Sequence, residues 1–194
     1  SDIYSYPVRF IVADLQGWLC RSHPDFHIPA DIDVGEHFDG DELGRKLKEA
    51  GADSIVVFGK CHYGHAYYPT KIGTVHPRLK TNILGNAVDG CHKHDIAFSA
   101  YYSVFLDTCA AIKHPQWRVK STDTSANAGF DSGNYTKVCV NSGYIEELLI
   151  PQSVEIVSRD NVREIFYDTM TGFQPCFCDT CKIKYGKPIP SDST

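Results

Sequence analysis

The chain has 194 residues and a formal net charge of -5 at pH 7. A nucleic-acid partner needs a basic face, and the Lys and Arg residues are scattered without any run, so nucleic acid is excluded. No stretch of 18 apolar residues occurs, so we expect no membrane span and no membrane partner.

The chain has eight cysteines, which is a high number for its length. Five of them are isolated, several in apolar surroundings, which favours buried free thiols in a reducing compartment and hence a cytoplasmic protein. An even number of cysteines also permits disulfides.

Four segments in chain order read as buried strands of a single domain: residues 8–14, 54–59, 96–103 and 162–168. Helical patterns lie between them. The first is capped by Asp39 and ended by Gly51, the second carries apolar residues from Ile83 to Cys91, and the third runs from about residue 142 to 158. We expect Pro151 to kink or interrupt the third helix, and residues 186–194 to form an irregular tail.

Repeated strand–helix units predict an α/β fold with a parallel sheet and right-handed crossovers. Two architectures fit: the N-terminal half of a (β/α)₈ TIM barrel, or an open doubly wound sheet. The long, His-, Asp- and Tyr-rich segments all follow strands, which is common to both. No Gly-rich phosphate fingerprint follows the first strand, which weakens the nucleotide-binding option. A complete barrel has eight strand–helix units and typically about 250 residues, so a chain with four such units would supply half of one.

Candidate functional residues gather at the predicted carboxyl ends of the strands, which converge on one mouth in a barrel. Asp168 ends the fourth strand and is the candidate catalytic carboxylate, because glycoside hydrolysis uses a carboxylate at the oxocarbenium-like centre. A loop-anchoring or helix-capping Asp is the alternative. Residues expected to bind a carbohydrate substrate by hydrogen bonding or ring stacking are Asp14, Trp18, His62, His65, Tyr67, Tyr102 and Tyr167.

His62 and His65 lie three residues apart and leave three alternatives open. They could recognise sugar hydroxyls, form a pair of metal ligands in a zinc-dependent hydrolase, or pack under the neighbouring tyrosines. The spacing does not specify a metal site, and no third ligand is evident from the sequence.

A C-x-C-x-x-C motif, formed by Cys176, Cys178 and Cys181, predicts a structural zinc site. Cys109 is our first candidate for the fourth ligand, because it lies just past the preceding strand. Free or disulfide-linked cysteines are the alternative. We expect no cofactor to be required for catalysis itself.

Several segments together resemble the alpha-L-fucosidases and, more closely, the barrels named hypothetical glycosyl hydrolase 6. Residues 60–71, KCHYGHAYYPTK, are similar to the Lys-His-His-Asp-Gly-Phe…Pro-Ser/Thr-Lys segment of the fucosidases, with Cys61 in place of a His. The segments AYYS (100–103), HPQWR (114–118) and VCVNS (138–142) and the C-x-C-x-x-C motif also fit. The resemblance runs from about residue 8 to residue 185.

The resemblance implies a (β/α)₈ barrel that hydrolyses glycosides with retention. It implies that Asp168 is the nucleophile and that His62 binds sugar hydroxyls. A retaining enzyme needs a second carboxylate about 5–5.5 Å away, which the absent half of the barrel would supply. We therefore expect a complementary half-barrel or a homo-oligomer as partner, and an exo-acting enzyme on a small glycoside. A non-catalytic carbohydrate-binding or assembly half-barrel is the alternative.

Overall fold

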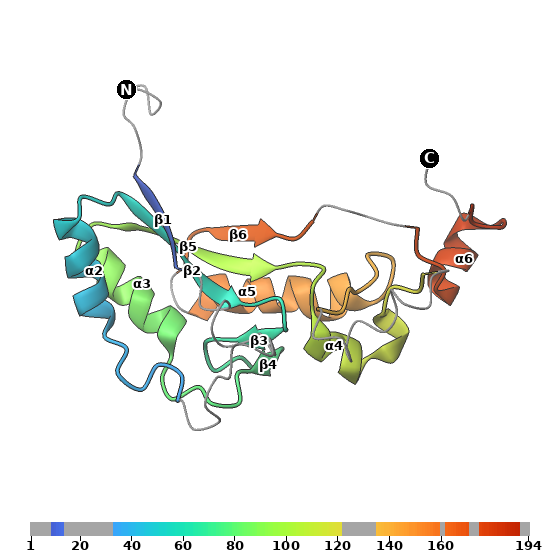
Figure 1. Cartoon of the computed structure of the whole chain (residues 1–194), viewed down its shortest axis with the longest axis horizontal. Helices are drawn as coiled ribbons and strands as arrows, with labels where there is room; N and C mark the ends of the chain where they lie inside the picture. Colours follow the sequence, from blue (N-terminus) through green and yellow to red (C-terminus); the bar gives the residue numbers. More distant parts are fainter. Residues whose placement is uncertain (1–8, 14–32, 122–134, 160–161, 171–174, 191–194) are drawn as a thin grey trace, which may run out of the picture.

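The computed structural model describes residues 9–13, 33–121, 135–159, 162–170 and 175–190. Within these residues, six strands form one sheet (Figure 1). β1 and β5 each pair in parallel with β2, and β6 pairs in parallel with β5. The two-residue β3 pairs antiparallel with the end of β2, and β4 pairs with β3. The strands are β1 (Phe10–Ala13), β2 (Ser54–Lys60), β3 (His65–Ala66), β4 (Thr74–Val75), β5 (Ala97–Ser103) and β6 (Ile165–Asp168).

The parallel strands lie in the order β1-β2-β5-β6, so each one neighbours the next long strand in the chain. A doubly wound sheet reverses its order at a switch point, whereas the strands of a (β/α)₈ barrel follow one another around the ring. The observed order is consistent with part of a barrel, and it disfavours the open doubly wound alternative. β2, β5 and β6 lie within the predicted segments or one residue beyond them.

The first described helix, α2 (Gly40–Glu49), begins at the position that the sequence predicts. Asp39 is its N-cap, and its carboxylate accepts hydrogen bonds from the backbone N–H groups of Asp41 and Glu42. The remaining helices are α3 (Ile83–Lys93), α4 (Thr108–Lys113), α5 (Ile150–Arg159) and α6 (Asp179–Tyr185), together with the short 3₁₀-helix η1 (Pro115–Trp117) and the π-helix η3 (Ile145–Leu149). No helix among the described segments has the length and apolar character needed to cross a membrane.

The predicted third helix is divided at the expected place. The π-helix η3 runs directly into α5, and Pro151 is the second residue of α5. The N–H of Ile150 bonds the carbonyl of Ile145, five residues back. Proline has no N–H to donate to the preceding turn, and a π-turn is one way in which a helix accommodates such an interruption. The helix therefore continues past Pro151.

α3 packs on β2 and β5, and α5 contributes Ile156 to the same buried core (Figure 1). Figure 1 shows α2 beside α3, and these two helices make close backbone contact through glycines. A Cβ built on Gly90 would lie 1.7 Å from the carbonyl oxygen of Gly40. The helix layer thus lies against one face of the sheet, and the carboxyl ends of β2, β5 and β6 remain neighbours.

Candidate functional site

Asp168 is the last residue of β6, and its two carboxylate oxygens are both hydrogen bonded. The Tyr101 hydroxyl on β5 donates to Oδ2 at 2.5 Å, and the backbone N–H of Thr169 donates to Oδ1 at 2.6 Å. The Tyr101 hydroxyl also lies 3.4 Å from Nδ1 of His62, which follows the end of β2. Three neighbouring parallel strands therefore bring His62, Tyr101 and Asp168 together at their carboxyl ends.

The contacts around Asp168 favour its ionised form. The hydrogen bond from Tyr101 is the largest influence and holds the pKa of the carboxyl below its ordinary value of 3.8. Burial is the second-largest influence and raises the pKa, whereas the N–H of Thr169 and the positive charge of a protonated His62 lower it further. Asp168 is therefore a carboxylate at neutral pH, the form required of a nucleophile and not of a general acid.

An aromatic column crosses the sheet beside this carboxylate. The rings of Phe58 and Tyr101 stack with centroids 3.9 Å apart, and Phe166 stacks on the other side of Tyr101 at 6.0 Å. Phe58 and Tyr101 are buried, whereas Phe166 is 45% exposed. Because side chains alternate along a strand, Phe166 and Asp168 share this face of β6. The face offers an accessible aromatic surface two residues from a charged carboxylate.

Tyr102 and Tyr167, both predicted to contact substrate, lie on the opposite face of the sheet from Asp168. The Tyr102 hydroxyl donates to Oε1 of Gln152 on α5, and the Tyr167 hydroxyl donates to Oγ of Ser153, each at 2.8 Å. Alternation along β5 and β6 directs both rings towards the helix layer. Tyr101, one residue earlier, is the tyrosine that reaches Asp168. The pairing register of β5 with β6 explains this: Asp168 pairs with Ser103, and Tyr101 lies two residues before Ser103 on the same face.

Tyr67 also differs from expectation. Its side chain has no exposed surface, and its ring stacks on His76 with centroids 5.7 Å apart. It is therefore a core residue, and the prediction that it contacts substrate does not agree with this burial.

His65 lies in the same aromatic group as Tyr67 and His76. Its ring meets His76 edge-on at 5.0 Å and stacks on Tyr63 at 5.3 Å. Burial, with a further contribution from His76, lowers the pKa of His65 to about 4, so its ring is neutral. Its Nδ1 is buried without a hydrogen-bond partner among the described residues. His62 instead contacts Tyr101 and Tyr135, so nothing in these contacts supports a His62–His65 metal pair.

Asp14 and Trp18, both predicted to contact substrate, lie outside the described residues. Their predicted contacts with substrate therefore stay predictions, and the site within the described residues consists of His62, Tyr101 and Asp168.

A buried ion pair joins the ends of β2 and β5 behind the site. The Lys60 ammonium lies 2.5 Å from Oδ2 of Asp107, donates to the Tyr144 hydroxyl at 2.9 Å and lies 4.6 Å from the centre of the Tyr102 ring. The pairing register of β2 with β5 shifts between Phe58 and Lys60. Such a bulge re-aims the next side chain, so Lys60 faces the helix layer together with Tyr102. The pair fixes the loops that follow both strands.

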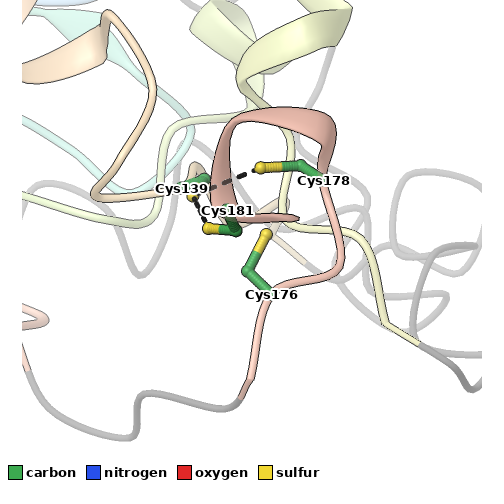
Figure 2. Close-up of side chains that lie close together, drawn as sticks. All are labelled: Cys139, Cys176, Cys178 and Cys181. Atoms are coloured by element: carbon green, nitrogen blue, oxygen red, sulfur yellow. Dashed lines mark hydrogen bonds between the residues drawn. The ribbon is translucent and has the colours of Figure 1, made fainter. Parts of the chain in front are cut away.

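Four cysteines form a second cluster, at the far end of the fold beside α6 (Figures 1 and 2). Cys176, Cys178 and Cys181 come together as the motif predicts, but the fourth member is Cys139 and not Cys109. Cys109 is instead the second residue of α4, where its backbone N–H bonds the carbonyl of Tyr63. Cys139 was missed as a ligand because its partners lie about 40 residues further along the chain, and its nearness to them follows only from the fold. Among the described residues, this is the one group of His, Cys, Asp or Glu side chains arranged to hold a metal ion.

Several solved structures that resemble this chain are alpha-L-fucosidases. Isoenzyme 2 from Paenibacillus thiaminolyticus has a TM-score of 0.74 and 28% identity over 93% of this chain. A GH29 alpha-L-fucosidase from Bacteroides thetaiotaomicron has a TM-score of 0.54 and 20% identity over 82%. The AlfC fucosyltransferase mutant N243A has a TM-score of 0.57 and 20% identity over 86%. The chain spans 26%, 38% and 59% of these three structures, respectively.

No curated protein matches the chain. The family model described as "Hypothetical glycosyl hydrolase 6" matches residues 39–169, which include β2, β5, β6 and the His62–Tyr101–Asp168 group. That match covers about two thirds of the sequence and agrees with the glycoside hydrolase fold of the solved neighbours. The chain belongs to the hypothetical glycosyl hydrolase 6 family and has the fold of a fucosidase-like glycosyl hydrolase domain.

Proposed function

We propose that this chain carries the nucleophile of a retaining glycoside hydrolase, and that Asp168 is that nucleophile. The observation that carries the proposal is the pair of hydrogen bonds that hold the Asp168 carboxylate ionised at the carboxyl end of a parallel strand. Active sites of barrel enzymes lie at this end of their strands. The substrate we propose is a small glycoside, cleaved from its end.

In the proposed reaction, a carboxylate oxygen of Asp168 attacks the anomeric carbon of the sugar. The glycosidic bond breaks, the leaving group departs with the bonding electron pair, and a glycosyl ester forms on Asp168. Tyr101 orients the carboxylate through its hydrogen bond to Oδ2. His62, beside Tyr101, is the candidate for a hydrogen bond to a sugar hydroxyl, and the exposed Phe166 ring offers a stacking surface.

The proposed mechanism also needs a general acid/base. Retaining enzymes place it about 5–5.5 Å from the nucleophile. Within the described part of the chain, the groups that act on the Asp168 carboxyl are Tyr101, Thr169 and His62, and none of them is a carboxylate. We assign the acid/base to the complementary half of the barrel, as a further part of the protein, a separate chain or a second copy. The same half would cover the exposed Phe166.

The test uses a substrate that needs no acid to leave. A 2-deoxy-2-fluoroglycosyl fluoride reacts with a retaining nucleophile by loss of fluoride, and the 2-fluorine slows hydrolysis of the resulting ester. We expect the intact mass of the wild-type chain to increase by one fluoroglycosyl group, with the adduct on the peptide that contains Asp168. A panel of fucosyl, galactosyl and glucosyl reagents would identify the preferred sugar.

Asp168→Asn should not be labelled, whereas Asp89→Asn, at an exposed position on α3, should be labelled like the wild type. Equal labelling of wild type and Asp168→Asn would refute the nucleophile assignment. Binding of the reagent without any adduct in the wild type would support the alternative function, a non-catalytic carbohydrate-binding or assembly half-barrel.

A further inference from the structure

We propose that Cys139, Cys176, Cys178 and Cys181 bind a structural zinc ion that joins the segment before α5 to the segment around α6. Figure 2 shows the four side chains directed towards a common centre, with Cys139 approaching from a separate part of the chain. This site is independent of the proposed glycosidase activity, because it uses none of the residues around Asp168.

The sulfur positions match a tetrahedral metal site. All four Sγ atoms lie within 4.8 Å of one another, with Cys139 Sγ 3.3 Å from Cys181 Sγ and 3.7 Å from Cys178 Sγ. Four sulfurs at about 2.3 Å from a zinc ion in tetrahedral geometry are about 3.8 Å apart. A disulfide requires about 2.05 Å between its sulfurs, which the Cys139–Cys181 separation exceeds. The cluster therefore has the dimensions of a tetrathiolate site.

Backbone and side-chain N–H groups surround the sulfurs. The N–H of Asn141 points at Cys139 Sγ at 3.4 Å, and the Asn141 side-chain amide donates to Cys181 Sγ at 3.3 Å. The N–H of Lys120 points at Cys176 Sγ at 3.4 Å. N–H donors of this kind stabilise the negative charge that thiolates carry when they coordinate a metal, and they fix the orientation of the ligands. Three of the four sulfurs thus receive such contacts.

The local backbone explains how the four ligands reach one point. Cys178 is the N-cap of α6 and Cys181 lies three residues later, so both project from the same side of the helix start. Cys139 is held in place because its N–H bonds the carbonyl of Trp117, while its own carbonyl accepts from the N–H of Ser142. Cys139 and Cys178 are each 2% exposed and Cys181 is 8% exposed. Cys176 is partly exposed, so three of the four cysteines are buried, and together they can fill all four positions of a tetrahedral metal ion.

A zinc ion in this place would be structural, because four protein ligands leave no open position for water or substrate. It would connect Cys139 to three cysteines that lie 37 to 42 positions further along the chain. Among the described residues, a small group of apolar side chains packs around the cluster, with Val119 and Ile189 at its border. A metal cross-link would take the place of the larger apolar core that so small a segment cannot form. The free energy of metal binding would then contribute to the stability of the folded chain.

The experiment measures zinc in the chain purified from zinc-supplemented culture without chelator. We expect about one zinc per chain by elemental analysis, and cobalt(II) exchanged into the site should give the visible and charge-transfer absorption of a tetrahedral thiolate complex. Removing zinc with a chelator should lower the melting temperature, and adding zinc back should restore it.

The matched variants are Cys139→Ser and Cys109→Ser, which make the same chemical change inside and outside the cluster. Cys139→Ser should lose most of its zinc, whereas Cys109→Ser should keep it. If Cys139→Ser does not fold, the cobalt spectrum of the wild-type chain alone decides the ligand type. Wild-type chain that binds neither zinc nor cobalt after reduction, or full zinc retention in Cys139→Ser, would overturn the proposal.

Discussion

The Tyr101 hydroxyl on β5 donates a hydrogen bond of 2.5 Å to Oδ2 of Asp168 on β6, across two neighbouring parallel strands. Hydrogen bonds to a charged group are shorter and stronger than neutral ones. This contact is the largest of the influences that lower the pKa of Asp168. It makes Tyr101 a positioning residue for the proposed nucleophile, and its effect is measurable apart from any catalytic activity.

We predict that Tyr101→Phe raises the pKa of Asp168 towards its ordinary value of 3.8, because the variant loses the hydroxyl that donates to the carboxylate. An NMR titration of the carboxyl carbon measures this directly. The lowered pKa in the folded state stabilises the protein above about pH 4, and this contribution is lost as the pH falls through the lowered value. The free energy of unfolding of Tyr101→Phe should therefore fall less than that of the wild type as the pH drops through this range.

Tyr102→Phe is the matched control for Tyr101→Phe. It removes the hydroxyl of the adjacent tyrosine, which bonds Gln152 on the opposite face of the sheet. The control should lower the free energy of unfolding, because it leaves a buried amide oxygen without its donor, yet leave the titration of Asp168 unchanged. If both variants moved the Asp168 pKa equally, the direct effect of the Tyr101 hydroxyl would be rejected.

We predict that His65 makes the free energy of unfolding depend on pH between about 6.5 and 4. Its pKa is 6.5 in an ordinary setting and about 4 in the folded chain, because burial disfavours the charged ring. The unfolded state therefore binds more protons in this range, so stability is full above pH 6.5 and falls as the pH drops towards 4. The maximal loss is about 3 kcal/mol for a shift of this size, and solvent screening reduces it.

Urea unfolding of wild type and His65→Gln between pH 4 and 7 tests this dependence. The variant should lose much of the slope, with the remainder supplied by other groups such as His76, whose pKa is also lowered by burial. His92→Gln, at an exposed position near the end of α3, should keep the wild-type slope. An unchanged slope in His65→Gln would show that His65 is accessible to protons in the folded chain.

The positions of the four long strands and most of the first two helices could be predicted from the sequence, because continuous apolar runs and caps such as Asp39 are local signals. The faces of Tyr101 and Tyr102 could not, because a shift of one residue in register exchanges every side chain between the two faces. The register depends on how β5 pairs with β6, which is a property of the whole sheet.

The cysteine cluster was likewise predictable only in part. The three cysteines of the C-x-C-x-x-C motif could be grouped by spacing alone, since they lie within six residues. Choosing between Cys109 and Cys139 required the path of the chain after β5, where Cys109 enters α4 and Cys139 approaches α6. The directions of the His62 and His65 side chains could not be predicted from the sequence either. Gly64 lies between them with a φ of 95°, and the chain turns sharply there.

We predict that Lys60→Met lowers the free energy of unfolding by about 3 to 5 kcal/mol, because it leaves the buried Asp107 carboxylate without its counter-charge. Urea unfolding at pH 7 measures the change. Arg45→Ala, which breaks the exposed Arg45–Glu49 pair on α2, is the control and should cost less than about 1 kcal/mol. Similar small losses in both variants would mean that water reaches Asp107 once Lys60 is removed.

We predict that Gly90→Ala destabilises the chain strongly although alanine favours helices. The new Cβ would lie 1.7 Å from the carbonyl oxygen of Gly40 and 2.1 Å from its carbonyl carbon, which are backbone atoms and cannot rotate away. α2 and α3 would have to separate, and overpacking of this kind costs about 1 to 3 kcal/mol or more, which exceeds the roughly 1 kcal/mol gained in helix propensity.

Asp89→Ala, one residue earlier on the exposed side of α3, is the control and should change the free energy of unfolding by about 0.5 kcal/mol or less. Urea unfolding of the two variants side by side separates them, and equal stability would show that the two helices do not meet at Gly40 and Gly90.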